Sequence, residues 1–318
     1  MTEQSRALVD TGSRLTHGRA VIDFAEEVGA EGPIAVVGGR TRWEVGGLPT
    51  VEPRLVSAPS GIVDYKPEEM VARVGAGTTV GELNAALSQH GQRSALPDRG
   101  GTVGGAVAVG ENDRDVLRWG AVRNAVLQVT YVSAEGKVVS GGGPTVKNVS
   151  GFDLPRLVVG SLGTLGALAE VILRTNPLPA VSRWFRSQAN PFDLYDQLLA
   201  PSCVLWDGST TWILLEGYGP DVDAEAGRAS EVGALTETEG PPDAPGPRRW
   251  SLPPGELRRF ALDCSEPFLA SIGVGTVLTT VVQDRGSSSP AVAAVHDRMK
   301  LLFDPSGRMN PGRNPEVR

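Results

Sequence analysis

The segment VKNVSGFDLPRLVVGSLGTLGALAE, at residues 146–170, carries the strongest structural signal in this chain. An apolar run at 154–159 leads into three glycines spaced three residues apart, which are Gly160, Gly163 and Gly166. Glycine at this density lets a backbone approach a flat or phosphorylated ligand closely and adopt positive φ values. A strand is predicted directly afterwards, at 167–173. The alternative interpretation is a tight turn between a helix and a strand.

Three further glycine-rich segments precede it and favour the ligand interpretation. VVGGRTR at 36–42 is a strand end running into a loop, and DRGGTVGG at 98–105 is a second loop with threonine in its middle. In RWGAVR, at 118–123, Gly120 lies between two arginines. Consecutive backbone N–H groups in such loops can bind a pyrophosphate without a full charge. GAGTTVG at 75–81 is one residue too long for an NAD fingerprint, so we interpret it as a structural turn.

In this order, the four segments resemble the FAD-binding domain of the vanillyl-alcohol oxidase and p-cresol methylhydroxylase superfamily. Within it, the resemblance is to the FAD-binding subunits of glycolate oxidases. FDPSGRMNPG, at 303–312, is similar to the closing signature of that family. The resemblance is dense over residues 38–177, returns at 301–313 and is faint between. It implies an FAD-linked oxidoreductase that acts on CH–OH groups.

The implied fold class is α+β: a two-subdomain p-cresol methylhydroxylase-type FAD-binding domain followed by a small α+β cap. We expect the FAD-binding domain at 1–177, the cap or substrate domain at 178–296, and a C-terminal segment at 297–318 that returns to the first domain. The pattern predicts helices at 19–28 and 78–90, a hairpin over 127–139 and a final helix at 292–302. In the cap it predicts strands at 212–216 and 268–275, a helix at 223–235 and a loop without core residues at 236–247.

The resemblance implies that FAD is the cofactor and assigns it the following residues: Val37, Gly38, Gly39, Arg40, Thr41, Arg42, Gly100, Gly101, Thr102, Gly104, Gly105, Gly120, Arg123, Lys147, Asn148, Gly151, Asp153, Gly160, Gly163, Thr164, Gly166 and Asn310. We expect side chains at Gly104 or Gly163 to occupy space meant for the cofactor. A cation at Lys147 would stabilise an anionic reduced flavin. The alternatives are a surface turn at 38–42, packing glycines at 100–105 and a solvated Lys147.

Three positions depart from the family pattern. Arg40 replaces the third glycine of the first loop, Asn124 replaces an aspartate, and Phe152 replaces a tyrosine. Compared with relatives, arginine narrows the backbone freedom at position 40, asparagine removes a charge at position 124, and phenylalanine removes a hydroxyl group at position 152. These departures favour a third hypothesis, in which the chain is a structural subunit that has lost its cofactor.

Histidine is scarce, with only His17, His90 and His296 in the chain. We interpret His90 as a cap at a helix end. The first loop lacks the histidine that many superfamily members attach to FAD, so we expect non-covalent FAD. The cap also lacks the histidine-rich metal motif of relatives that oxidise 2-hydroxy acids. Catalytic residues therefore stay unknown, and Tyr218, Asp207 and Glu216 are candidate bases without a distinguishing pattern.

Composition excludes several other classes. The net charge is −7, which argues against nucleic-acid binding. No apolar run is long enough to predict a membrane span, and the N-terminus does not resemble a secretory signal. The two cysteines, Cys203 and Cys264, form no Cys-x-x-Cys pair, so we expect no metal. We expect a cytoplasmic protein that associates with the membrane only through partners.

The leading functional hypothesis is a subunit of a glycolate oxidase-like 2-hydroxy-acid dehydrogenase complex. The resemblance implies a larger flavin subunit and an iron–sulfur subunit as its partners. The second hypothesis is a self-sufficient FAD-dependent dehydrogenase of an alcohol or hydroxy acid. Flavin content separates both from the structural subunit, and turnover by the isolated chain separates the second from the first.

Overall fold

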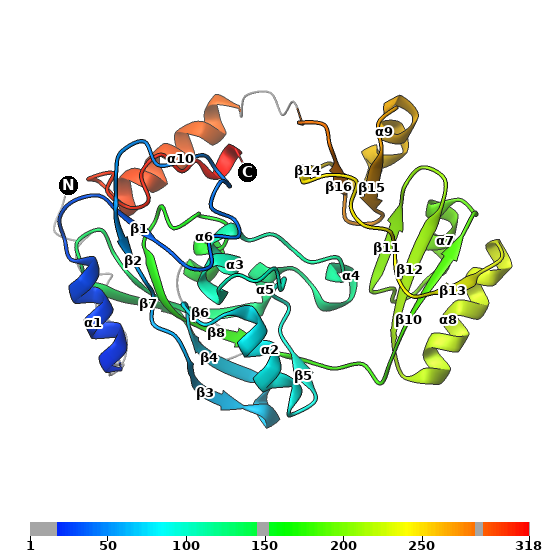
Figure 1. Cartoon of the computed structure of the whole chain (residues 1–318), viewed down its shortest axis with the longest axis horizontal. Coiled ribbons are helices and arrows are strands. Elements are labelled where there is room, and N and C mark those ends of the chain that lie inside the picture. The colour runs from blue at the N-terminus through cyan, green and yellow to red at the C-terminus, as the bar shows by residue number, and fades with distance from the viewer. Residues whose placement is uncertain (1–17, 145–152, 284–288, 318) are drawn as a thin grey trace.

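The computed structural model describes residues 18–144, 153–283 and 289–317 of the chain. Figure 1 shows two sheet-containing parts, with the N-terminal part on the left and the later part on the right. Each part has its own buried apolar cluster. The protein therefore combines helices with two antiparallel sheets, which agrees with the predicted α+β class. The chain crosses from the first part to the second after residue 177.

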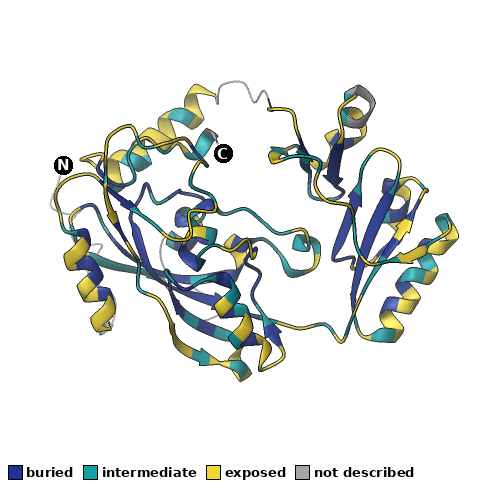
Figure 2. Ribbon diagram, viewed as in Figure 1, coloured by how far each residue is buried: buried dark blue, intermediate teal, exposed yellow. Residues whose placement is uncertain are grey.

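The first part is built on a five-stranded antiparallel sheet with the strand order β3-β4-β8-β6-β7. Its central strand, β8, is buried along seven of its eight residues because helices cover both faces. Figure 2 shows this strand in the buried colour. The strands are β3 (Ile62–Lys66), β4 (Val71–Gly75), β6 (Val126–Val132), β7 (Val138–Gly142) and β8 (Ala167–Arg174).

Helices α2 and α3 pack on one face of this sheet and α1 packs on the other. The helix predicted at 19–28 is confirmed, with Val21, Phe24 and Val28 buried. The capped helix predicted from residue 78 is also confirmed: the Thr79 hydroxyl accepts from the Glu82 N–H, and the Glu82 carboxylate accepts from the Thr79 N–H. The helices are α1 (Arg19–Val28), α2 (Val80–Ser88), α3 (Val103–Val109), α4 (Val116–Trp119), α5 (Val122–Ala125) and α6 (Leu154–Val158).

Short elements complete the first part. A parallel pair of strands lies beside α1, and a second, antiparallel pair leads into the linker. His90 follows α2 and packs edge-on against the Tyr65 ring at 5.3 Å, so it does not cap the helix, whose C-cap is Gln89. The elements are β1 (Ile34–Val36), β2 (Arg54–Val56), β5 (Gln92–Arg93), β9 (Asn176–Pro177) and the 3-10 turn η2 (Pro67–Glu69).

The second part is a seven-stranded antiparallel sheet with the order β13-β10-β12-β11-β15-β16-β14. One buried cluster joins its strands to α7, α8 and α9. The strands are β10 (Val181–Ser187), β11 (Cys203–Trp206), β12 (Thr211–Gly217), β13 (Thr236–Thr238), β14 (Arg248–Ser251), β15 (Phe268–Ser271) and β16 (Thr276–Thr279). The helices are α7 (Pro191–Gln197), α8 (Gly219–Val232) and α9 (Leu257–Asp263), with the 3-10 turn η3 (Pro254–Glu256).

Three predictions for this part are wrong in detail. The loop expected at 236–247 begins with an edge strand, β13, which pairs with β10. The single strand expected at 268–275 is a hairpin of β15 and β16, because the chain turns at Gly273 and Gly275, which both have positive φ. The predicted helix begins earlier, at Gly219, since the Pro220 ring is compatible with a first helical turn.

The C-terminal segment packs against the first part. Helix α10 (Pro290–Phe303) is followed by a bridge between Met309 and Ile34 of β1, and the chain ends in the turn η4 (Pro315–Val317). The expected boundary at 296/297 falls inside α10. The division into three segments stays a prediction.

Asp304 and Arg308 anchor this return. The buried Asp304 carboxylate accepts from Lys300 Nζ at 2.6 Å and from the Met309 N–H at 2.7 Å. Burial raises the pKa of Asp304, but these donors outweigh burial and lower it overall. Arg308 is 4% exposed. Its guanidinium group donates to the carbonyl of Val28, the last residue of α1, and to the carbonyl of Gly32, four residues later. The closing signature is therefore fixed against β1 and α1.

Candidate functional site

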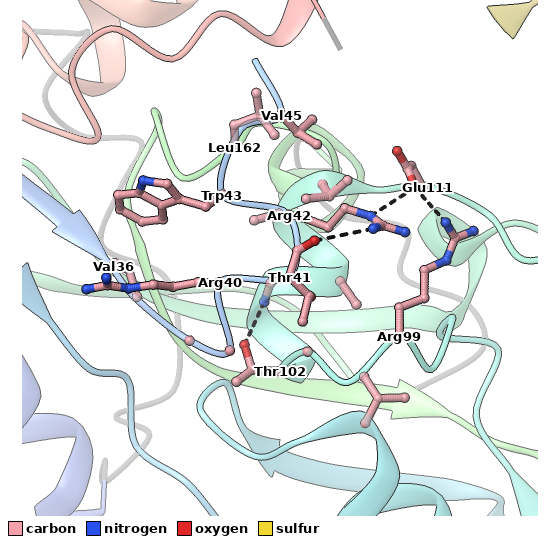
Figure 3. Close-up of a pocket in the computed structure, with 18 of the residues that line it drawn as sticks. Val36, Arg40, Thr41, Arg42, Trp43, Val45, Arg99, Thr102, Glu111 and Leu162 are labelled. Atoms are coloured by element: carbon pink, nitrogen blue, oxygen red, sulfur yellow. Dashed lines mark hydrogen bonds and ion pairs between the residues drawn. The ribbon is translucent and has the colours of Figure 1, made fainter. Parts of the chain in front are cut away.

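Two adjoining cavities lie where the glycine-rich loops of the first part meet the C-terminal segment. They enclose about 820 Å³ and 470 Å³ of empty space, open to solvent. Figure 3 shows the larger one, with side chains from the first loop and Arg99, Glu111 and Leu162 around it. Seven residues line both cavities, so we treat them as one site: Val36, Gly38, Thr102, Gly105, Ala108, Leu162 and Asn310.

The first loop keeps the conformation that a glycine would adopt at its third position. Arg40 has φ +55°, in the left-handed region that favours glycine. Its guanidinium group lies 5.5 Å from the Trp43 ring, which also faces Arg313 at 4.7 Å. The departure at position 40 therefore adds a cation to the cavity wall without changing the course of the backbone.

Close packing against the second loop explains the two glycines that precede Arg40. A Cβ at Gly38 would lie 2.5 Å from the Thr102 hydroxyl, and one at Gly39 would lie 2.8 Å from the Gly100 carbonyl oxygen. Real Cβ atoms do not approach other atoms so closely. Gly38 and Gly39 therefore let the first loop pack directly against the second loop, and both loops line the cavity.

The second loop ends where α3 begins. The Thr102 hydroxyl accepts from the Gly105 N–H at 3.1 Å and caps the helix. Gly104 lines the smaller cavity, so its predicted role next to the cofactor stays a prediction, but a Cβ there would also lie 2.8 Å from Ala76 Cβ and 2.9 Å from the Ala76 carbonyl oxygen. Gly104 is required by packing between α3 and the residue after β4.

The third loop, at 160–166, forms the back wall. Gly160, Leu162 and Gly163 all have positive φ, and the Leu162 N–H donates to the Ala108 carbonyl at 2.8 Å. Gly163 and Gly166 line the smaller cavity. A Cβ at Gly166 would lie 2.4 Å from the Tyr131 ring, so this glycine too serves packing. Gly160 and Thr164 line a different cavity, next to α10.

Asn310 closes the site from the C-terminal segment and has φ +49°. Its side-chain N–H donates to the Leu162 carbonyl, and its backbone N–H donates to the Ile34 carbonyl at 2.8 Å. The side-chain oxygen is buried without a partner among the described residues. A buried acceptor without a donor is costly unless a ligand supplies one. Asn310 lines both cavities, so this acceptor without a partner lies next to the space that a bound group would occupy.

Four arginines give the larger cavity a positive wall. They are Arg40, Arg42, Arg99 and Arg313, and Glu111 is the one acid among the described lining residues. Burial lowers the pKa of Arg313, which still lies far above neutrality as a guanidinium. A positive cavity with glycine-loop backbone suits a ligand with anionic phosphates.

The other predicted residues lie away from these cavities, lie outside the described residues or line the cavities. Gly100, with φ +72°, supports the second loop, and Gly120, with φ +81°, ends α4; neither lines these cavities. Arg123 lies exposed on α5, and Asp153 caps α6 by accepting from the Arg156 N–H. Lys147, Asn148 and Gly151 lie outside the described residues. Val37, Thr41 and Gly101 line the cavities, and their contact with the cofactor stays a prediction.

Sequence reasoning missed several lining residues. Trp43 directly follows the first loop, Arg99 lies inside the second, and Arg313 follows the closing signature, so their positions next to motifs were a usable signal. Glu111 lies in no motif and had none. The missed residues include Trp43, Val45, Val80, Pro97, Arg99, Glu111, Leu162 and Arg313.

None of the three candidate bases lies in this site. Asp207 accepts from the Ser209 and Thr210 N–H groups in a turn, and Tyr218 is 67% exposed. Glu216 is held between the two parts by Arg93 and Trp119. Among the residues that the structure describes, no His, Cys, Tyr, Lys or Asp lines either cavity. The same part of the chain contains no cluster of three or more metal-ligating side chains.

Comparison with known proteins agrees with this geometry. Residues 15–142 match a protein-family model described as an FAD binding domain. Glycolate oxidase subunit GlcE of Escherichia coli is 28% identical over 332 residues, which cover 88% of this chain and 92% of that protein. A D-lactate dehydrogenase of Archaeoglobus fulgidus is 35% identical over 162 residues, which cover 50% of this chain and 36% of that enzyme.

A solved structure shares the fold. An alkyldihydroxyacetonephosphate synthase superposes with a TM-score of 0.66 at 14% identity, over 92% of this chain and 73% of that one. In the described part of our chain, no helix combines the length and apolar character needed to cross a membrane.

Proposed function

We propose that the two joined cavities hold FAD, because residues 15–142 match a family model described as an FAD binding domain and the relatives named above are a glycolate oxidase subunit and a D-lactate dehydrogenase. The observation that carries this proposal is the wall of the larger cavity, which glycine-loop backbone and four arginines form. The backbone of residues 38–42 and the guanidinium groups of Arg40 and Arg42 would bind the pyrophosphate. Asn310 would accept a hydrogen bond from the cofactor.

We further propose that FAD binds without a covalent bond. The first loop, residues 38–42, contains no histidine that could attach to FAD, and the Arg40 guanidinium group lies over the Trp43 ring. The described lining residues offer no imidazole, thiol or phenol to the cofactor. When bound, FAD supplies the capacity to accept a hydride equivalent from a CH–OH group.

The substrate class that fits best is a 2-hydroxy acid. Two relatives described above are named as a glycolate oxidase subunit and a D-lactate dehydrogenase. A general base must lie within hydrogen-bond reach of the substrate hydroxyl. Among the described lining residues of the larger cavity, Glu111 is the one carboxylate, and it lies between two arginines rather than next to an open base position. We therefore propose that this chain is one subunit of a complex, with a larger flavin subunit and an iron–sulfur subunit, in the cytoplasm or attached to the membrane through those partners.

The alternatives are weaker. A self-sufficient dehydrogenase needs a base that the described site does not offer. A structural subunit without cofactor was favoured by the departure at position 40, but Arg40 keeps the left-handed conformation of the glycine that it replaces. The smaller backbone freedom of arginine at position 40 is therefore no argument that the protein has lost its FAD. Asn124 lies exposed on α5, and Phe152 lies outside the described residues.

Anaerobic reduction tests the proposed role. We expect glycolate or D-lactate to bleach the flavin of the isolated chain slowly or not at all, because no base is in place. The measurement is flavin absorbance near 450 nm in a stopped-flow instrument, with chemical reduction by dithionite as the control for a competent flavin. Rapid, stoichiometric bleaching by either acid would instead establish the self-sufficient dehydrogenase.

A further inference from the structure

Three ionisable side chains converge on one point in the wall of the larger cavity. Glu111 Oε2 lies 3.5 Å from Arg42 Nε and 3.4 Å from Arg99 Nη1 (Figure 3). All three residues line the cavity. Arg42 comes from the first loop, Arg99 from the second, and Glu111 from the segment after α3, so three separate backbone segments place their charges together.

The two contacts are weak compared with close ion pairs in this protein. Lys300 Nζ and Asp304 Oδ2, for example, lie 2.6 Å apart. Within the described residues, neither guanidinium group reaches Glu111 with hydrogen-bond geometry, and the Arg42 Nη1 donates instead to the Thr41 carbonyl at 3.3 Å. Glu111 Oε2 therefore lies between the two guanidinium groups. Most N–H donors of both groups can still bind an incoming anion.

We propose that Arg42 and Arg99 form an anion-binding site and that Glu111 is a built-in competitor for it. The ligand chemistry is a pair of anionic oxygens on one centre, which bidentate guanidinium groups recognise well. Two sources could supply it, a phosphate of the dinucleotide or the carboxylate of a 2-hydroxy acid. Glu111 lowers the affinity for either, since the incoming anion must displace it or share the arginines with it.

Exposure and charge support this arrangement over a purely structural ion pair. The side chains of Arg42 and Arg99 are 33% and 39% exposed, so both face the open cavity, whereas Glu111 is 18% exposed. An ion pair formed only for stability gains little at such exposure. The three charges leave a net +1, and Arg40 and Arg313 in the same wall add to it.

The inference rests on the proposed FAD site, and the first experiment separates the two. Apo-protein is titrated with FAD and, separately, with inorganic pyrophosphate. If phosphate is the anion, Glu111→Gln should tighten binding of both on the order of tenfold, and Arg99→Gln should weaken it by a similar factor. Glu111→Asp, which retains the charge, should restore nearly wild-type affinity. Wild-type protein that binds no FAD refutes the proposed function, whereas wild-type binding that Glu111→Gln leaves unchanged refutes only the phosphate source.

The second experiment tests the carboxylate source with FAD-loaded protein and oxalate. Oxalate binding is measured from the change in the flavin spectrum. If the substrate carboxylate is the ligand, Glu111→Gln should tighten oxalate binding to the FAD-loaded protein on the order of tenfold. Glu44→Gln is the matched control, because it removes the same charge two residues from Arg42 at an exposed position outside the cavity lining. Unchanged affinity for FAD, pyrophosphate and oxalate in folded Glu111→Gln protein, or an equal effect of Glu44→Gln, overturns the inference.

Discussion

An Arg308→Met variant is expected to lose about 3–5 kcal/mol of unfolding free energy. The Arg308 guanidinium group donates to five backbone carbonyls, at distances from 2.8 to 3.2 Å, which belong to Val28, Gly29, Glu31, Gly32 and Ala134. Methionine fills similar space but leaves these acceptors without donors in a buried site. Because Arg308 also fixes Met309 and Asn310 beside β1, FAD affinity should fall together with stability.

Arg54 provides the matched control for this prediction. It donates to the carbonyls of Glu27 and Val28 at the same end of α1, but it is exposed, so water can replace it. Arg54→Met should therefore cost less than about 1 kcal/mol. Urea denaturation followed by circular dichroism measures both variants. Equal losses for Arg308→Met and Arg54→Met would show that burial of the Arg308 contacts does not stabilise the C-terminal return.

A Glu216→Ala variant is expected to lose about 3 kcal/mol, because Glu216 joins the two sheet-containing parts. Its carboxylate, on β12, accepts from Arg93 at 3.2 Å and from the Trp119 indole N–H at 3.1 Å. Arg93 also pairs with Asp115 at 3.0 Å and lies over the Trp119 ring. Burial, followed by repulsion from Asp113, raises the pKa of Asp115 even though Arg93 opposes the shift.

The raised pKa of Asp115 makes the stability of this junction depend on pH. A carboxyl whose folded pKa is raised binds more protons in the folded than in the unfolded protein, so its contribution to stability falls as the pH rises through the raised pKa. Glu237→Ala is the control for Glu216→Ala, since Glu237 forms an exposed ion pair with Arg183 that water can replace. If thermal melting shows no greater loss for Glu216→Ala than for Glu237→Ala, the junction is not a stabilising contact.

The glycine-rich loops could be predicted because the resemblance is dense over residues 38–177. What the residue types alone could not show is the reason for each glycine. Gly38, Gly39 and Gly104 exclude a side chain because protein atoms lie against them, whereas Gly163 has positive φ and lines the cavity. Conversely, arginine at position 40 suggested a lost conformation, although a non-glycine residue adopts φ +55° there.

The charged side chains of the site were harder to predict. Asp153 was assigned to the cofactor, but it is a helix cap, and a cap and a ligand contact use the same residue type after a loop. Glu111 reaches Arg42 and Arg99 only because α3 ends beside both loops, which is a tertiary relation without a local pattern. The seven-stranded order of the second sheet was equally out of reach, because its edge strands are short and separated in the sequence by loops.

Flavin content after denaturation tests the central claim most directly. We expect purified protein to carry one FAD per chain and to release all of it into the supernatant when acid precipitates the protein. Flavin absorbance of the supernatant and of the dissolved pellet, divided by protein concentration, gives the ratio and its distribution. Flavin retained in the pellet would contradict non-covalent binding, and folded, colourless protein that takes up no added FAD would contradict the cofactor site itself.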